Sequence, residues 1–85
     1  MFTPRKAQLL RAVVREYIGS ASPVASEALA KKHSLGVSPA TIRIDMADLE
    51  DEGFITRSYS SAGAVPSDKG YRFYVESMPK VEEVP

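Results

Sequence analysis

The sequence predicts a mainly helical α+β domain in which three helices precede a two-stranded β-hairpin and a C-terminal helix. Apolar residues recur at helical spacing through residues 4–18 and again through residues 38–52. A segment rich in β-branched and aromatic residues follows at 54–59, and a Ser/Gly turn separates it from a short return strand. The chain has 85 residues, 44% of them hydrophobic, which is enough apolar material for one modest core. We therefore expect one domain at residues 1–78, followed by a linker-like tail at 79–85 that leads toward an absent C-terminal region.

The first two helices have clear boundaries in the sequence. Thr3-Pro4 predicts a helix start, because a hydroxyl side chain caps the first turn and proline suits the first helical position. Gly19 is expected to end this helix, and a second, shorter helix is expected to begin near Ser26. The apolar stripe predicted to bury the first helix consists of Leu9, Leu10, Val13, Val14, Tyr17 and Ile18.

The third helix has the strongest pattern in the chain. Gly36 suits a turn residue with positive φ, Ser38 caps the helix and Pro39 takes its first position. Gly53 closes the helix after an acidic run at 48–52. Two sets of side chains are predicted on opposite faces: Ile42, Met46 and Leu49 toward the core, and Ala40, Ile44, Ala47 and Asp51 toward solvent.

A β-hairpin and a final helix complete the predicted domain. Residues 54–59 form the first strand, residues 60–63 the turn and residues 64–66 the return strand, where Pro66 is compatible only with an edge or a strand end. Ser67 caps the last helix, whose predicted inward residues are Tyr71, Tyr74, Val75 and Met78. Three helices followed by a hairpin are typical of the winged helix-turn-helix fold, with a recognition helix at about 38–52 and a wing at about 57–65.

Composition excludes several classes of protein. The chain has no cysteine, so disulfides and thiolate metal sites are excluded, and no apolar run reaches membrane-spanning length. We expect a cytoplasmic protein with no membrane association. Asp45 and Asp48 lie close together on one helix but have no accompanying base, nucleophile or phosphate loop, and His33 has no second ligand nearby. We therefore expect no enzyme activity, no metal and no cofactor.

The distribution of charge favours a nucleic-acid partner. The formal net charge is zero. Residues 1–43 nevertheless carry seven Lys/Arg and two acidic residues. Residues 44–85 carry four Lys/Arg and nine acidic residues. This asymmetry permits a basic face on a neutral protein, although by itself it is weak evidence.

The third helix is the candidate reader of the DNA major groove. Its first turn offers unpaired N–H groups to a phosphate. Arg43 could bond a guanine edge, or could equally be a solvated or phosphate-bound arginine. Thr41 could bond a phosphate or touch a thymine methyl, and Ile44 could meet a thymine methyl or another protein surface unless the predicted helix phase is slightly wrong.

The wing supplies the second group of candidates, on the adjacent backbone or minor groove. Arg57 and small residues at its tip allow close approach to DNA, although surface hairpins commonly have this composition. The candidate DNA-binding residues are Ser38, Pro39, Ala40, Thr41, Arg43, Ile44, Arg57, Ser60, Ser61, Gly63 and Lys69.

Two blocks of sequence are distinctive. The first is Val37–Arg43 with Met46–Glu50 and Glu52-Gly53, and the second is Ser61–Gly63 with Pro66–Val75. Together they resemble the N-terminal winged-helix DNA-binding domain of the HrcA family, the heat-inducible transcription repressors. The likeness covers nearly all of the chain from Gln8 to Met78.

The resemblance implies a dimeric repressor of chaperone genes. Such a repressor binds double-stranded DNA at an inverted-repeat operator and depends on the GroE chaperonin, and its larger C-terminal portion, which contains a GAF-like domain, is absent here. The linker-like tail favours a truncated chain over a stand-alone relative. Two positions depart from the family pattern, which usually has a polar residue at Ile44 and an arginine at Ala64. These departures, with the near-neutral charge, leave two alternatives open: a winged-helix protein-interaction module, or a DNA-binding regulator with a different operator.

Overall fold

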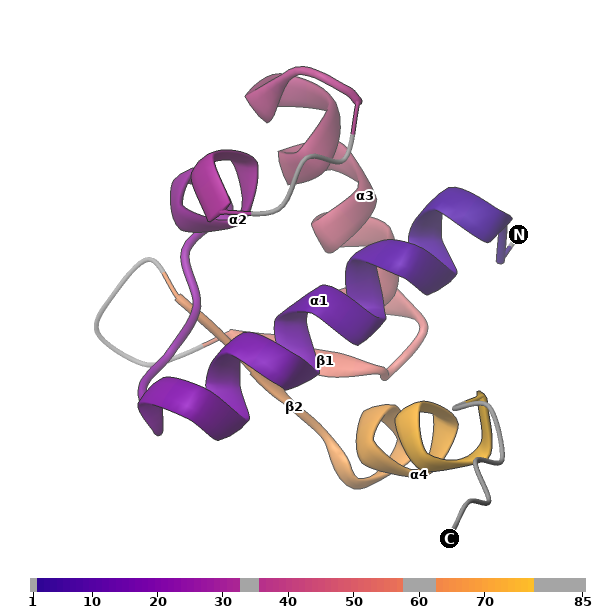
Figure 1. Ribbon diagram of the computed structural model, residues 1–85. Helices are drawn as coiled ribbons and strands as arrows, with labels where there is room; N and C mark the ends of the chain where they lie inside the picture. The colour runs from indigo at the N-terminus through magenta and orange to yellow at the C-terminus, as the bar shows by residue number, and fades with distance from the viewer. Residues whose placement is uncertain (1, 33–35, 58–62, 78–85) are drawn as a thin grey trace, which may run out of the picture.

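The computed structural model describes residues 2–32, 36–57 and 63–77. Its elements are α1 (Pro4–Ser20), α2 (Ser26–Lys32), α3 (Pro39–Asp51), β1 (Ile55–Arg57), β2 (Ala64–Pro66) and α4 (Asp68–Ser77). Figure 1 shows α1 running diagonally through the middle of the molecule, with α2 and α3 above it, the hairpin crossing it and α4 below. The predicted winged helix-turn-helix order is confirmed, with the first strand described from Ile55 to Arg57. Several predicted positions lie outside the described residues: 58–59 of the strand, 60–62 of the turn, Met78 of the last helix and 79–85 of the tail.

The core forms where α1 meets α3, the hairpin and α2. Helix α1 contacts α3 and β2, and α2 contacts α3. The buried apolar side chains, which come from five of the six elements and from one loop residue, are Leu9, Leu10, Ala12, Val13, Val14, Val24, Leu29, Ile42, Met46, Leu49, Ile55 and Ala64. The predicted inward residues of α3 are all among them. A single core therefore fixes α3 through one face and leaves its other face exposed.

Helix α1 begins as predicted but ends one residue later than expected. The Thr3 hydroxyl accepts a hydrogen bond from the Lys6 backbone N–H at 3.1 Å. The helix continues through Gly19 to Ser20, and Ala21 ends it with a φ of 57°. The prediction that Ile18 is buried is wrong, since it is 59% exposed. The buried face also includes Lys6 and Ala12, so it is rotated away from Ile18 relative to the predicted stripe.

The hairpin is antiparallel and has a third, unpredicted neighbour. Ile55 pairs with Pro66, Thr56 with Val65 and Arg57 with Ala64. Val24, in the connection between α1 and α2, forms an isolated bridge with Ala64 through two backbone hydrogen bonds of 2.9 Å. This bridge ties the base of the wing to the segment that leads into α2.

Helix α4 packs through an aromatic cluster that the sequence analysis missed. The Phe2 ring stacks on Phe54 with centroids 4.9 Å apart, and Phe73 meets Phe2 edge-on at 5.0 Å. Ser67 caps the helix as predicted, because its hydroxyl accepts from the Gly70 N–H. The predicted burial of Val75 is wrong: it is 66% exposed, because Phe73 and Gly70 turn another face inward.

Candidate nucleic-acid interface

Two ion pairs fix α3 against the start of α1. The Arg5 guanidinium donates to both carboxylate oxygens of Asp45, with Nε–Oδ2 at 2.6 Å and Nη2–Oδ1 at 3.2 Å. The Lys6 ammonium lies 2.9 Å from Asp48 Oδ2. Hydrogen bonding to Asp45 raises the pKa of Arg5, and hydrogen bonding to Asp48 raises the pKa of Lys6. These contacts set the orientation of α3. They also neutralise the positive charges of Arg5 and Lys6, which the charge distribution along the sequence had predicted to lie on a basic face.

The first turn of α3 is exposed and capped. The Ser38 hydroxyl accepts from the Thr41 N–H at 3.2 Å and lies 3.1 Å from the Thr41 hydroxyl. Ser38, Pro39 and Ala40 are exposed, whereas Thr41 is half-buried. Proline at the first helical position has no N–H to satisfy. The sequence at this turn therefore favours a stable helix start at the protein surface.

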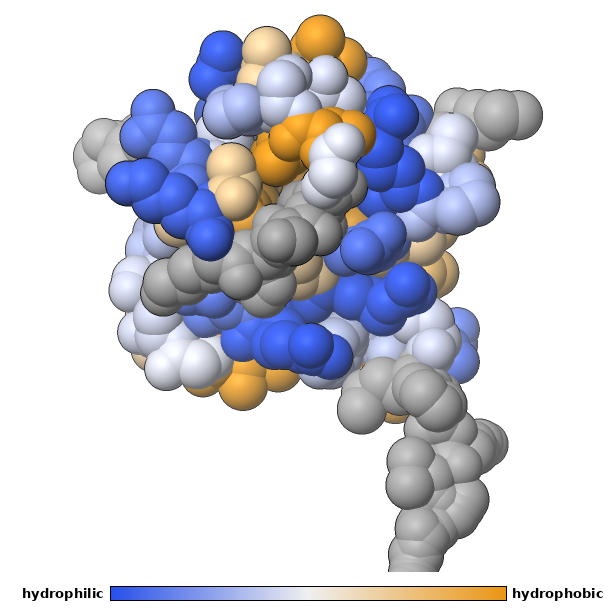
Figure 2. All heavy atoms as spheres, turned by 45° about the horizontal axis from the view of Figure 1, so that its top comes forward, coloured by the Kyte–Doolittle hydropathy of each residue, from blue (hydrophilic) through white to orange (hydrophobic). Residues whose placement is uncertain are grey.

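The outward face of α3 matches the predicted one. Ala40, Ile44, Ala47 and Asp51 are all exposed, and Ile44 is 63% exposed. The helix phase predicted from the sequence is therefore correct. Figure 2, in which the side of α2 and the start of α3 is turned forward, shows hydrophobic surfaces interspersed with hydrophilic side chains. The face combines polar and apolar groups, as a surface that reads base edges requires.

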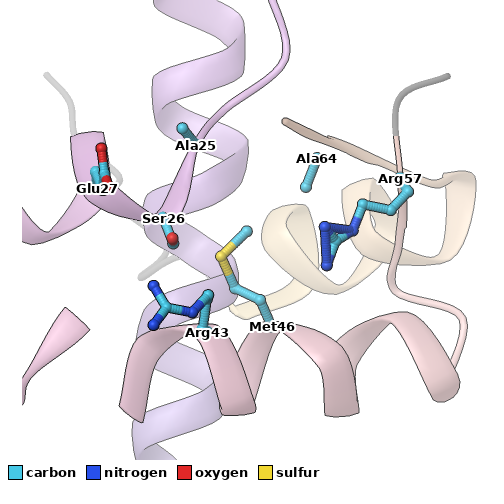
Figure 3. Close-up of a pocket in the computed structure, with 7 residues that line it drawn as sticks. All are labelled: Ala25, Ser26, Glu27, Arg43, Met46, Arg57 and Ala64. Atoms are coloured by element: carbon cyan, nitrogen blue, oxygen red, sulfur yellow. The ribbon is translucent and has the colours of Figure 1, made fainter. Parts of the chain in front are cut away.

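A pocket of about 260 Å³ lies between α2, α3 and the hairpin. Arg43 and Met46 rise into it from α3, and Arg57 enters from β1 (Figure 3). Ser26 and Glu27, at the start of α2, line the other side. Both predicted DNA-binding arginines therefore border one hollow beside the recognition helix. Ser26 and Glu27 were not predicted as site residues, because nothing in their local sequence pattern places them opposite Arg43.

The second arginine of this pocket is partly neutralised. Arg57 Nε lies 3.5 Å from Glu50 Oε1, and both side chains are about half exposed to solvent, at 50% and 40%. An exposed pair of this kind is weak and is easily exchanged for another anion. Arg43 is exposed on the flank of α3, one residue after its first turn.

Two candidates do not join the group around α3. Lys69 lies at the opposite end of α3, where its ammonium donates to the Glu52 carbonyl at 2.8 Å and sits 4.5 Å from the centroid of the Phe54 ring. Gly63 is buried, and a Cβ at this position would lie 2.3 Å from Pro23 Cβ. Its lack of a side chain serves packing against Pro23, so we remove it from the candidate contacts. Ser60 and Ser61 lie outside the described residues.

Ala64, one of the two departures from the family pattern, is also buried. It is 2% exposed, lines the arginine pocket and pairs with both Arg57 and Val24. A larger side chain here would enter the pocket between α3 and the wing. The alanine therefore leaves this hollow open.

No helix in the described part of the chain is both long enough and apolar enough to cross a membrane. The described residues also contain no cluster of three or more side chains suited to hold a metal ion.

Comparison with known proteins supports a helix-turn-helix assignment. The chain is 51% identical over 82 residues to the heat-inducible transcription repressor HrcA of Streptomyces albus G, covering 96% of this chain and 24% of that protein. It is 58% identical over 78 residues to the HrcA repressor of Bifidobacterium animalis subsp. lactis (strain AD011), covering 92% and 21%. The chain thus spans about a quarter of the length of the curated relatives it matches, and the predicted resemblance to the HrcA N-terminal region is confirmed.

A solved structure and a family profile agree with this likeness. A crystal structure described as that of a hypothetical protein superposes with a TM-score of 0.85 at 43% identity, covering 87% of this chain and 23% of that one. The profile of the DeoR-like helix-turn-helix domain matches residues 5–68, which include all of α1 except Pro4 and the whole of α2, α3 and both strands. The chain belongs to the family of DeoR-like helix-turn-helix domains.

Proposed function

We propose that this chain is the DNA-binding domain of a bacterial transcription repressor of heat-shock genes. The observation that carries the proposal is the exposed N-terminal half of α3, where a capped first turn is followed by Arg43, which borders the arginine pocket, and by exposed Ile44. The HrcA repressors that it resembles are named for heat-inducible repression. We propose that residues 1–78 form the DNA-binding domain and that this domain catalyses no reaction.

In this proposal, α3 enters the major groove with its N-terminal half. The Thr41 and Ile42 N–H groups are bonded to Ser38, so the first turn offers the Ala40 N–H and the positive dipole end to a backbone phosphate. Arg43 reaches either a guanine edge or a phosphate, and Arg57 exchanges Glu50 for the backbone beside the wing. The acidic C-terminal half of α3, from Asp48 onward, stays off the DNA because it repels phosphate.

The partners and the location follow from the resemblance to HrcA. We infer an inverted-repeat operator bound by a homodimer in the cytoplasm, with repression dependent on the GroE chaperonin. Two domains of such a dimer would meet half-sites about 34 Å apart or a multiple of this distance. A single domain would bind more weakly, because the second half-site no longer adds to the first.

Fluorescence anisotropy tests this function. The domain is titrated with a duplex that carries an HrcA-type inverted repeat and, in parallel, with a scrambled duplex, each over a series of salt concentrations. Preference for the repeat, with affinity that falls steeply as salt rises, supports the proposal. Equal, salt-sensitive binding to both duplexes indicates a changed operator or a need for the dimer. Absence of binding to either duplex at low salt contradicts the proposal.

A second candidate function is docking of another protein on the same face. It is favoured by the 63% exposure of Ile44 and by the use of Arg5 and Lys6 in ion pairs within the domain. The anisotropy experiment separates the two, because a protein-docking module would show no steep salt dependence with DNA.

A further inference from the structure

The outward face of α3 has an apolar centre that the fold does not use. Ile44 is 63% exposed, whereas Ile42 and Met46 on either side of it in sequence are 1% and 6% exposed. Buried Asp45 is held by Arg5, so the orientation of this helix segment is fixed by other residues. Ile44 can therefore be replaced without opening the core, and its apolar surface is free for a ligand of this face.

The neighbours of Ile44 along the helix are small. Ala40 and Ala47 lie one turn before and one turn after it on the same exposed face. The branched Ile44 side chain therefore projects from the middle of an apolar strip, about 10 Å long, that has an alanine methyl group at each end. No large side chain on this strip prevents a flat surface from approaching Ile44, and such a strip fits the floor of a major groove.

Resting on the proposed function, we infer that Ile44 reads a thymine in the operator through contact with the C5-methyl group. An isoleucine side chain can neither donate nor accept a hydrogen bond. Among the groups that base pairs present in the major groove, the thymine methyl is the one apolar group that projects from the base edge, whereas cytosine has only a hydrogen at C5. Against guanine, cytosine or adenine, Ile44 would displace water from a donor or acceptor and replace none of its hydrogen bonds.

The polar groups around Ile44 support this assignment. Arg43 is the adjacent residue and is exposed, the Thr41 hydroxyl lies about one turn toward the N-terminus and the Ser38 hydroxyl caps the helix before it. Cationic and hydroxyl groups that bind phosphate can hold the start of the helix while an apolar group beside them contacts a base. This arrangement favours DNA over an apolar protein partner as the occupant of the face.

Deoxyuridine scanning tests the inference. Each thymine of the tightest-binding duplex is replaced in turn by deoxyuridine, which removes the methyl and leaves base pairing and the other groove groups unchanged. We expect one position in each half-site where the wild-type domain binds about fourfold more weakly, the effect of removing one buried methyl from the contact. Ile44→Ala should bind the thymine duplex more weakly and should lose its sensitivity at that same position. Arg15→Ala, at an exposed position of α1 outside the proposed site, should retain it.

The outcomes separate this inference from the proposed function. If wild type and Ile44→Ala respond equally to deoxyuridine at every position, the methyl contact does not involve Ile44 and the inference is wrong, while DNA binding stands. If no duplex binds at low salt, both fail. Circular dichroism of Ile44→Ala should show an unchanged unfolding midpoint within error, which excludes loss of fold as the cause.

Discussion

Arg5 at the start of α1 and Asp45 in the middle of α3 are joined by a two-point ion pair, although they are 40 residues apart in sequence. Asp45 is only 3% exposed, whereas the Arg5 side chain is 49% exposed. The half-exposed Arg5 guanidinium therefore pairs with an Asp45 carboxylate that is buried away from water. This contact holds the recognition helix at a fixed angle to α1.

Removing one partner of this pair should be worse than removing both. Arg5→Ala leaves the Asp45 carboxylate buried without the guanidinium, whereas Arg5→Ala with Asp45→Asn removes the uncompensated charge. We expect the urea midpoint to fall in the single variant and to recover partly in the double variant. Arg15→Ala, on an exposed position of α1, serves as the control and should change little. A double variant less stable than Arg5→Ala alone would contradict this account of the pair.

Alkaline pH should weaken the fold through Lys6. Hydrogen bonding to Asp48 raises the pKa of Lys6 above its ordinary value of 10.5. The ammonium is then favoured in the folded state, so its contribution to stability is complete below 10.5 and is lost as pH rises through the folded pKa. Urea titrations over alkaline pH should show a steeper fall in stability for wild type than for Lys6→Met. Tyrosine ionisation affects both proteins and cancels in the difference, and parallel curves would contradict the prediction.

Gly63 should tolerate no side chain. A Cβ there would lie 2.3 Å from Pro23 Cβ and 2.9 Å from the Pro23 carbonyl carbon, so the Val24–Ala64 bridge would have to shift. We expect Gly63→Ala to lower the free energy of unfolding by about 1–3 kcal/mol. Gly19→Ala is the matched control: it is helical with nothing within 4 Å of its Cβ, and it should raise stability by up to about 1 kcal/mol. Equal effects at the two positions in chemical denaturation would disprove the close-approach argument.

Ser38 should show separable roles in folding and in DNA binding. Ser38→Ala removes the hydroxyl that accepts from the Thr41 N–H, and should cost about 1 kcal/mol of stability. Ser38→Asp keeps an acceptor and complements the helix dipole, so the stability should be retained. Its added negative charge should nevertheless weaken binding to the operator duplex in anisotropy titrations. Full affinity in Ser38→Asp would place the first turn of α3 away from DNA phosphates.

The boundaries of α3 were predictable because they depend on local chemistry. Ser38-Pro39 starts the helix, Gly53 takes a φ of 84° directly after its end, and the faces between them follow from spacing alone. The exposure of Ile18 and Val75 was not predictable in this way. Each lies on a helix whose buried face depends on contacts with residues distant in sequence. In α4, for example, Phe73 packs against the rings of Phe2 and Phe54.

The same distinction applies to the candidate site. The exposure of Ala40, Arg43 and Ile44 followed from the helix phase. The packing of Gly63 against Pro23, and the capture of Lys69 by the Glu52 carbonyl, depend on contacts between segments that no local pattern reveals. A count of charges in each half of the chain was misleading for a related reason, because Arg5 and Lys6 pair with acids of the other half.

Arg43 and Lys69 should differ sharply in their effect on DNA affinity. Arg43 borders the pocket beside the first turn of α3, whereas Lys69 caps its far end. Arg43→Ala should weaken operator binding by about 5- to 150-fold, since one arginine contact to a base edge contributes about 1–3 kcal/mol. Lys69→Ala removes the same charge and should leave affinity nearly unchanged. Anisotropy at one fixed salt concentration compares them, and equal losses would indicate a general charge effect.

The central claim is that the N-terminal half of α3, together with Arg57, is the surface that meets DNA. Titration of the isotope-labelled domain with an inverted-repeat duplex, followed by amide chemical shifts in NMR, tests it most directly. We predict the largest shifts at residues 38–44 and at Arg57, and small shifts at Lys69 and along α4. Shifts concentrated on α4 or on the exposed side of α1, with residues 38–44 unaffected, would contradict it.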